Sequence, residues 1–291
     1  MTITIRDFFK QFPDDDACLA HLFNVRFGQD HVCPNCGKTA KWYKIKATRA
    51  YSCQWCGWHL HPMAGTLFED TRTPLQLWFY AIYLFTTSRH GVPAKEMQRQ
   101  LGVTYKTAWR MGHEIRKHMA AVDGDEQLRG QVEVDEAYVG GVVSGEGRGL
   151  KMRNKTVVFG MVERGGDLMT KVMPKADHAT ILREIGHNVR RGSTIHTDES
   201  TLYERLSTRG YKHRTVNHKA DEYAAPDGRG TNAIEGFFSH LKRSISGTHV
   251  AVSQKHLAKY VGEFEYRHNS RQEPDAMLPE LLSVFPPLDE E

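Results

Sequence analysis

Residues 131–139 read QVEVDEAYV, and this stretch decides how the second half of the 291-residue chain is interpreted. Apolar and polar residues alternate from Val132 onward, which is the pattern of a strand buried on one face. Val132 and Val134 face the core in this pattern, so Asp135 leaves the apolar side. Glu133 shares the side of Asp135 and is its nearest competitor as a metal ligand. The stretch therefore predicts a strand that presents a carboxylate outside its apolar face.

The segments that follow predict a mixed α/β sheet with flanking helices. Strands are expected at 156–163, 168–173, 193–198 and 211–216, and helices at 177–190 and 200–208. Strands that come first in a run and then alternate with helices fit such a sheet, and a ribonuclease-H-like core has this order. That core places acids at the ends of adjacent strands. Asp198 ends the predicted strand at 193–198, and Glu199 is its nearest competitor as a metal ligand.

A third acidic cluster lies on a predicted helix that begins near Asn232. Its residues form two stripes, because side chains three, four and seven positions apart share a helix face. The apolar stripe consists of Ile234, Phe237, Phe238, Leu241 and Ile245. The polar stripe consists of Asn232, Glu235, Ser239 and Lys242. The pair Asn232 and Glu235 also has the spacing of a capping box, which requires no chemistry, and both interpretations can hold together.

Two Cys-x-x-Cys pairs precede these elements. They are Cys33 with Cys36 and Cys53 with Cys56, and each pair is followed by a glycine that permits a tight turn. Four thiolates at this spacing suit a tetrahedral Zn²⁺, and they leave no open position, so we expect one structural zinc ion. This spacing is typical of metal binding in a reducing compartment and not of a secreted disulfide framework.

Residues 71–122 predict a helix-turn-helix module. An apolar helix from Pro74 to Phe85 is followed by a helix at 93–101, a turn at 102–103 and a helix capped by Thr104. The last helix has a buried stripe consisting of Ala108, Met111, Ile115 and Met119. Its opposite face carries Lys106, Arg110, His113 and Lys117. Such a helix suits the DNA major groove, although an ordinary amphipathic helix has the same pattern.

Charge is distributed unevenly along the chain. Residues 71–120 carry 8 basic and 2 acidic residues, whereas residues 121–291 carry 23 basic and 26 acidic residues. A basic segment beside an acidic one fits a nucleic-acid-binding module joined to a cation-binding module. The basic residues that could neutralise phosphates near the acids include Arg148, Lys151, Arg153 and Arg214. No apolar run is long enough to predict a membrane span, and no secretion signal opens the chain.

Five motifs together resemble bacterial insertion-sequence transposases with a DD(N/E)K catalytic site and an N-terminal zinc ribbon. They are VDEAYVGG, TDES with Tyr203 after it, VNH, TNAIEGFFSHLKRSISGTH and SQKHLAKYVGEFEYRHNSR, and the resemblance covers residues 15–272. It implies that Asp135, Asp198 and Glu235 bind two Mg²⁺ or Mn²⁺ ions, with Lys242 as the trailing lysine. Members of the group differ over whether Asn or Glu is third, so Asn232 stays an alternative. Glu235 is favoured because an anionic oxygen binds Mg²⁺ better than an amide does.

This resemblance implies a transposase that binds the ends of an insertion sequence. It would catalyse Mg²⁺-dependent strand cleavage and strand transfer by two-metal phosphoryl transfer. The expected partners are transposon ends, target DNA and further copies of the chain, in the bacterial cytoplasm at the nucleoid. The expected organisation is residues 1–70 with a zinc ribbon at 33–56, a helix-turn-helix domain at 71–122, a ribonuclease-H-like catalytic domain at 123–272 and a tail at 273–291.

Two alternatives belong to different functional classes. A ribonuclease-H-like nuclease or resolvase would cut DNA without rejoining it, and an assay for joined products separates it from a transposase. A non-catalytic DNA-binding regulator with a zinc ribbon and a helix-turn-helix would need neither Mg²⁺ nor the three acids. A third alternative, a redox protein, is weak, because such a protein would need only one Cys-x-x-Cys pair and this chain has two.

Overall fold

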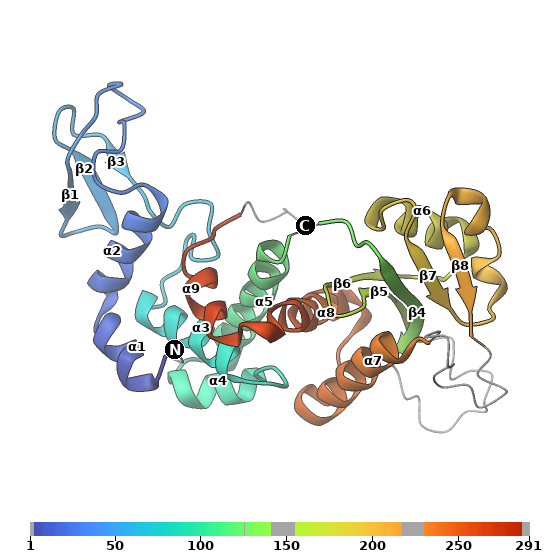
Figure 1. Cartoon of the computed structure of the whole chain (residues 1–291). Helices are drawn as coiled ribbons and strands as arrows, with labels where there is room; N and C mark the ends of the chain where they lie inside the picture. Colours follow the sequence, from blue (N-terminus) through green and yellow to red (C-terminus); the bar gives the residue numbers. More distant parts are fainter. Residues whose placement is uncertain (1–2, 125, 141–154, 217–229, 287–291) are drawn as a thin grey trace. The chain divides into compact units, whose positions relative to one another are not determined.

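The computed structural model describes residues 3–124, 126–140, 155–216 and 230–286. The chain divides into two compact units (Figure 1), a ribbon unit of residues 1–122 with 273–291 and a sheet unit of residues 123–272. The predicted basic residues Arg148, Lys151 and Arg153 lie outside the described residues. None of the described helices combines the length and apolar character needed to cross a bilayer.

The ribbon unit begins with two helices and a small antiparallel sheet. The helices are α1 (Ile5–Gln11) and α2 (Asp15–Arg26), and the strands, in the order β1-β2-β3, are Trp42–Ile45, Ala50–Cys53 and His59–Leu60. Asp14 caps α2 by accepting the backbone N–H of Ala17 at 2.8 Å. The Tyr51 ring of β2 stacks on Phe23 of α2, with centroids 4.1 Å apart. This aromatic contact packs the small sheet against α2.

Three further helices follow in the ribbon unit. They are α3 (Leu75–Thr87), α4 (Ala94–Leu101) and α5 (Tyr105–Val122). Gly102 ends α4 with φ 65°, and the Thr104 hydroxyl accepts the backbone N–H of Thr107 at 3.2 Å, as a capping residue does. The predicted buried stripe of α5 is confirmed, since the side chains of Ala108, Met111, Ile115 and Met119 are all fully buried.

The C-terminal segment completes this unit. Helix α9 (Met277–Leu281) packs against α3 and α5. His118 of α5 is hydrogen-bonded to the carbonyl oxygen of Leu281 at 2.9 Å, and His21 of α2 to that of Leu282 at 2.8 Å. The C-terminal segment, which the sequence predicted only as a tail, therefore covers part of the helical core.

The sheet unit contains the predicted mixed sheet, in the order β6-β5-β4-β7-β8 (Figure 1). The strands are β4 (Gln131–Val139), β5 (Thr156–Glu163), β6 (Leu168–Met173), β7 (Thr194–Thr197) and β8 (Lys212–Thr215). β4, β5 and β6 pair antiparallel, whereas β4 with β7 and β7 with β8 pair parallel. The mixed α/β class and the bounds of the first three strands are confirmed.

The predicted helix at 200–208 is wrong. Two short 3₁₀ turns, Thr201–Tyr203 and Ser207–Arg209, take its place. Tyr203 ends the first turn and Leu206 lies between the two turns, and both side chains are fully buried. The segment therefore buries its apolar residues in separate short turns and does not continue as one helix.

Helices cover both faces of the five-stranded sheet. One apolar cluster joins Val132, Val134 and the odd-numbered residues of β5 to α6 (His178–Asn188). The other joins Ala137, Val139 and even-numbered β5 residues to α7 (Asn232–Ser244) and α8 (Gln254–Asn269). Strand β5 is apolar on both sides because it lies between the two layers.

Candidate active site and zinc centre

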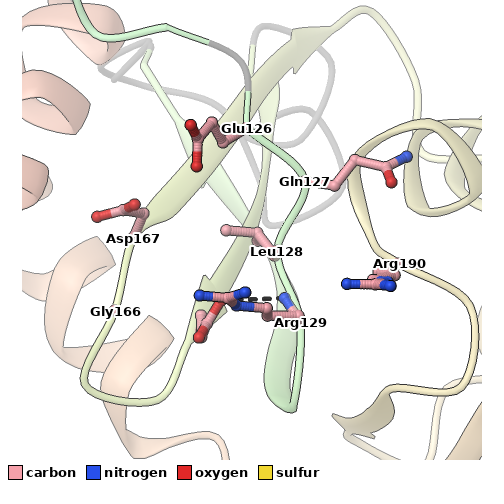
Figure 2. A pocket seen from close by; sticks show the side chains of 8 residues that line it. Glu126, Gln127, Leu128, Arg129, Gly166, Asp167 and Arg190 are labelled. Carbon is pink, nitrogen blue, oxygen red and sulfur yellow. Dashed lines mark hydrogen bonds between the residues drawn. The ribbon is translucent and has the colours of Figure 1, made fainter.

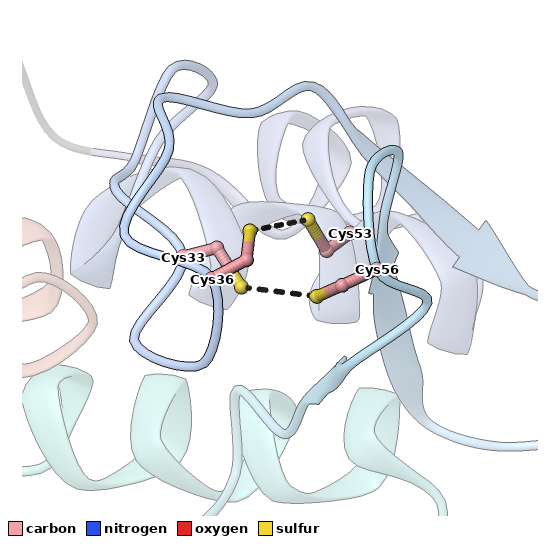
Figure 3. Close-up of side chains that lie close together, drawn as sticks. All are labelled: Cys33, Cys36, Cys53 and Cys56. Carbon is pink, nitrogen blue, oxygen red and sulfur yellow. Dashed lines mark hydrogen bonds between the residues drawn. The ribbon is translucent and has the colours of Figure 1, made fainter.

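The four cysteine sulfurs meet between two turns of the ribbon unit (Figure 3). All four Sγ atoms lie within 4.8 Å of one another, with 3.6 Å from Cys33 to Cys56 and 3.9 Å from Cys36 to Cys53. Thiolates about 2.3 Å from a tetrahedral Zn²⁺ are about 3.8 Å apart, so this donor set fits one zinc ion. A disulfide would require about 2.05 Å.

The backbone around the sulfurs supports the same interpretation. Gly37 and Gly57 follow the two pairs with φ 68° and φ 73°, a conformation that side chains other than glycine rarely adopt. The Asn35 side chain donates a hydrogen bond to Cys56 Sγ at 3.5 Å. Such contacts orient thiolate ligands and stabilise their charge. The predicted four-cysteine centre is therefore present.

Asp135 and Asp198 lie on neighbouring parallel strands. Glu133 of β4 pairs with His196 of β7, so continuing the register by two residues brings Asp198 opposite Asp135. Neighbouring strands are about 4.8 Å apart. Asp198 directly follows β7, and its Oδ1 accepts the backbone N–H of Ser200 at 3.0 Å. The parallel pairing of β4 with β7 thus brings together two acids that are distant in the sequence.

Glu235 reaches the same region from α7, because the first turns of this helix pass close to Gly160. Gly160 of β5 is the register partner of Asp135. A Cβ atom on Gly160 would lie 2.6 Å from Ile234 Cδ1 and 2.9 Å from Phe238 Cζ. The missing side chain therefore lets α7 approach the sheet beside Asp135. All five residues of the predicted apolar stripe of α7 are buried against the sheet layer.

These carboxylates act on one another electrostatically. Burial, together with the charges of Glu136, Asp198 and Glu235, raises the pKa of Asp135 to about 7, against a backbone hydrogen bond at Glu136 that lowers it. Within the described residues, only the four cysteines bring three donor atoms within 4.8 Å of one another. The acids therefore share one electrostatic environment without forming a closed cage of ligand atoms.

Glu136 points to the other face of β4, toward the α6 layer. The hydroxyl of Tyr203, which is fully buried, donates a hydrogen bond to its carboxylate. Burial raises the pKa of Glu136, and the Tyr203 hydrogen bond opposes this rise. The sequence indicated Tyr203 only as part of a motif, because no local pattern links it to a strand 67 residues away.

Glu133 is engaged elsewhere and is not a free competitor of Asp135. Its Oε1 accepts the Nε–H of Arg164 at 2.8 Å, and its Oε2 accepts the backbone N–H groups of Ala233 at 2.7 Å and Ile234 at 3.3 Å. The residue is 3% exposed. Glu133 therefore joins β4 to the first turn of α7.

The capping-box interpretation of Asn232 is wrong. Thr231 occupies the N-cap position, and Asn232 is the exposed first residue of α7. The Thr231 hydroxyl donates to Glu235 Oε1 at 2.7 Å instead of accepting a backbone N–H. The carboxylate of Glu133 accepts the backbone N–H groups that a local cap would have accepted. Lys242 lies two turns further along α7 and is exposed.

The predicted cationic face of α5 is smaller than expected. Lys106 and Arg110 are exposed and Lys117 is half-buried, but His113 is 4% exposed and does not belong to this face. The His113 ring lies 3.9 Å from that of Trp109, one turn earlier on the same helix. Helix α5 is packed by α3, α4 and α9. Arg214 is exposed on β8.

A separate pocket of about 530 Å³ lies at the sheet end where β4 and β7 begin (Figure 2). Its lining includes Arg129 and Arg190 with Glu126, Glu163 and Asp167. The backbone N–H of Arg129 donates to the Glu163 carboxylate at 3.0 Å. Asp198 follows the opposite end of β7, so this pocket is not part of the acidic cluster.

A four-cysteine ribbon and a mixed sheet that brings carboxylates together define a zinc-ribbon protein with an α/β domain. Residues 13–59 match the transposase zinc-ribbon domain, and residues 127–269 match the ISXO2-like transposase domain. The chain belongs to this family of insertion-sequence transposases.

Similar proteins occur in Halobacterium salinarum and Haemophilus influenzae. A protein in the transposable element ISH50 of Halobacterium salinarum is 25% identical over 288 residues, covering 91% of this chain and 94% of that protein. A transposase-like protein of Haemophilus influenzae is 28% identical over 103 residues, covering 35% of this chain and 81% of that protein. A chain in the crystal structure of the Mos1 strand transfer complex is 11% identical in sequence, and the match covers 71% of this chain and 78% of that chain. The TM-score of 0.26 is too low to indicate a shared fold.

Proposed function

We propose that this transposase cuts and joins DNA strands at a site formed by Asp135, Asp198 and Glu235. The observation that carries the proposal is the convergence of three acids from separate elements. Asp135 lies on β4, Asp198 follows β7 in the register opposite it, and Glu235 lies on the first turn of α7, and burial and the charges of the other two acids raise the pKa of Asp135. Acids on separate elements are the usual ligands for a pair of divalent cations in phosphodiester chemistry. The strand order β6-β5-β4-β7-β8 supports a ribonuclease-H-like assignment for the sheet unit.

The chemistry of the donor set fits Mg²⁺ or Mn²⁺, because hard cations prefer carboxylate oxygens. Two such ions would supply activation of the attacking oxygen and stabilisation of the leaving oxygen. Asp135, Asp198 and Glu235 would hold these ions, and burial and the charges of Asp198 and Glu235 raise the pKa of Asp135. The Thr231 hydroxyl donates a hydrogen bond to Glu235 Oε1 at 2.7 Å and so orients this carboxylate. Asn232, one turn earlier on α7, is the alternative third ligand.

Lys242 would contact a phosphate of the bound DNA. It lies seven residues after Glu235 on α7, which returns it to nearly the same angle about two turns away. Its ammonium group is exposed, so it can reach a strand that passes over the acids. We assign it a role in phosphate binding and in stabilising charge during strand transfer.

The ribbon unit would bind the ends of the insertion sequence through α5. Lys106 is exposed near the start of this helix, where a docked helix contacts DNA. Lys106→Ala should weaken end binding and reduce by about one the slope of log affinity against log salt concentration. The exposed Lys10 of α1 provides the matched control, and equal salt slopes for both variants would contradict this assignment.

The test of catalysis is Mg²⁺-dependent cleavage and joining of the element's own ends. Asp135→Asn, Asp198→Asn and Glu235→Gln should each lose at least about a hundredfold in strand transfer and keep end binding. Glu199→Gln is the control, because Glu199 is exposed beside Asp198. Cleavage without joined products would favour a nuclease or resolvase, and end binding without any Mg²⁺-dependent cleavage by the wild type would favour a regulator. Strand transfer that survives all three substitutions would refute the assignment of the site. The number of protein copies per DNA end in the complex tests the expectation that further copies of the chain take part.

A further inference from the structure

Glu133 is a buried carboxylate on β4 whose contacts reach two other parts of the sheet unit. It lies two residues before Asp135 on the same face of β4. Arg164, from the turn between β5 and β6, donates to one of its oxygens, and the first turn of α7 donates to the other. With both oxygens accepting at 2.7–3.3 Å and only 3% exposure, this carboxylate is placed to hold protein elements together.

Arg164 adds a second connection between the same elements. Its backbone N–H donates to the carbonyl oxygen of Gln131 at 2.9 Å, at the start of β4. Its guanidinium donates both to Glu133 and, at 2.9 Å, to the carbonyl oxygen of Gly230, just before α7. The planar guanidinium group can make these two bonds at once because its donors are fixed in direction.

The first turn of α7 depends on this distant carboxylate because its own sequence does not cap it. The Thr231 side chain makes no capping hydrogen bond, and Asn232 is already helical. Glu133, a hundred residues earlier in the chain, accepts two of the N–H groups that begin the helix. A carboxylate is also favoured there by the positive end of the helix dipole.

This arrangement opposes a repulsion that is built into the site. Asp135 and Glu235 carry like charges. The hydrogen bonds between Glu133 and the first turn of α7 lie beside both acids, because Asp135 comes two residues after Glu133 and Glu235 comes one residue after Ile234. Gly160 removes the side chain that would keep α7 from the sheet. The contacts of Glu133 and Arg164 and the close packing at Gly160 thus both act on how α7 approaches the sheet beside Asp135.

We infer that Glu133 is a positioning residue that sets the separation of Asp135 and Glu235 and thereby the affinity of the site for divalent metal. This inference rests on the proposed function, since it takes these acids as metal ligands. Glu133 itself does not contact the metal. Groups that orient metal ligands typically change affinity by about 10- to 100-fold when they are removed.

The test compares Glu133→Gln with a control in the full-length, zinc-loaded protein. In the variant an amide NH₂ must face either Arg164 or the α7 N–H groups, so one donor opposes another. The control, Glu263→Gln, alters a fully buried carboxylate of the same unit that accepts from Arg267 within α8. Mn²⁺ binding is followed by electron paramagnetic resonance, and the first turn of α7 by amide hydrogen exchange.

We expect Glu133→Gln to weaken Mn²⁺ binding by about tenfold or more and to speed amide hydrogen exchange at Ala233 and Ile234. The control, Glu263→Gln, should change Mn²⁺ binding by less than about twofold. Wild-type Mn²⁺ affinity in Glu133→Gln, or an equal loss in the control, overturns the inference. Should Glu133→Gln not fold, Arg164→Lys removes the bond to Gly230 and is judged by the same criteria. The proposed function fails separately, when Asp135→Asn binds Mn²⁺ as wild type does.

Discussion

Replacing Asp135 by asparagine should make the sheet unit less sensitive to pH in Mg²⁺-free buffer. Burial and three neighbouring carboxylates raise the pKa of Asp135 from 3.8 to about 7 in the folded chain. The folded state therefore retains a proton that the unfolded state loses, so this group's contribution to stability declines as pH rises through the window between those values. Above about pH 7 the carboxylate is charged in both states and the full penalty applies.

The size of the effect follows from the two pKa values. Each pKa unit corresponds to about 1.4 kcal/mol, so the whole window is worth about 4 kcal/mol and the part between pH 5 and pH 8 about 3 kcal/mol. The free energy of unfolding of the wild-type sheet unit should thus fall by about 3 kcal/mol more than that of Asp135→Asn over this range. Added Mg²⁺ should reduce the difference, because a bound cation stabilises the charged form.

The assay must report on the sheet unit alone. All five tryptophans lie between residues 42 and 109, so their fluorescence follows the ribbon unit and serves as an internal control. Amide hydrogen exchange at β4 and β5 measures the stability of the sheet unit. Glu199→Gln, which alters an exposed acid, should keep the wild-type pH dependence. Parallel pH profiles for wild type and Asp135→Asn would refute the electrostatic coupling of the three acids.

Three further changes test other parts of the structure. Gly160→Ala should lower the free energy of unfolding in urea by about 1–3 kcal/mol and reduce strand transfer, because the added Cβ collides with α7. Gly186→Ala is the control in the same denaturation experiment, and it should be neutral or stabilising because nothing lies within 4 Å of a Cβ at this position of α6. Tyr203→Phe should destabilise the sheet unit by about 1.5–3 kcal/mol through the lost hydrogen bond to Glu136, and an unchanged urea midpoint would contradict this. Cys36→Ser, or chelation of zinc, should unfold the small sheet by tryptophan fluorescence while amide protection in β4 persists.

Much of the sheet unit could be predicted from local pattern. The strands at 131–139, 156–163 and 168–173 have the predicted bounds, since alternation and apolar runs directly reflect which faces are buried. The apolar stripe of α7 was predicted for the same reason. The segment at 200–208 was predicted wrongly, because two buried residues three positions apart, Tyr203 and Leu206, fit an α-helix as well as a pair of short 3₁₀ turns.

The helical part of the ribbon unit shows where pattern fails. His113 was expected on an exposed cationic face, yet its side chain is buried beside Trp109. The face of a helix that meets solvent depends on every element packed around it, and α9 arrives from the far end of the chain. A single-helix projection cannot include that contact.

The sequence by itself determined the four-cysteine centre and the mixed sheet, and it predicted which acids form one site. These rest on spacing within a short segment, on periodicity and on resemblance between motifs. Only the tertiary structure decided which neighbouring acid is structural, because Glu133 and Asp135 have the same place in the strand pattern. Their roles separate through α7 and Arg164, whose backbone and side-chain donors engage one carboxylate and leave the other beside Asp198 and Glu235. Contacts over such sequence distances arise from chain packing, which no local pattern records.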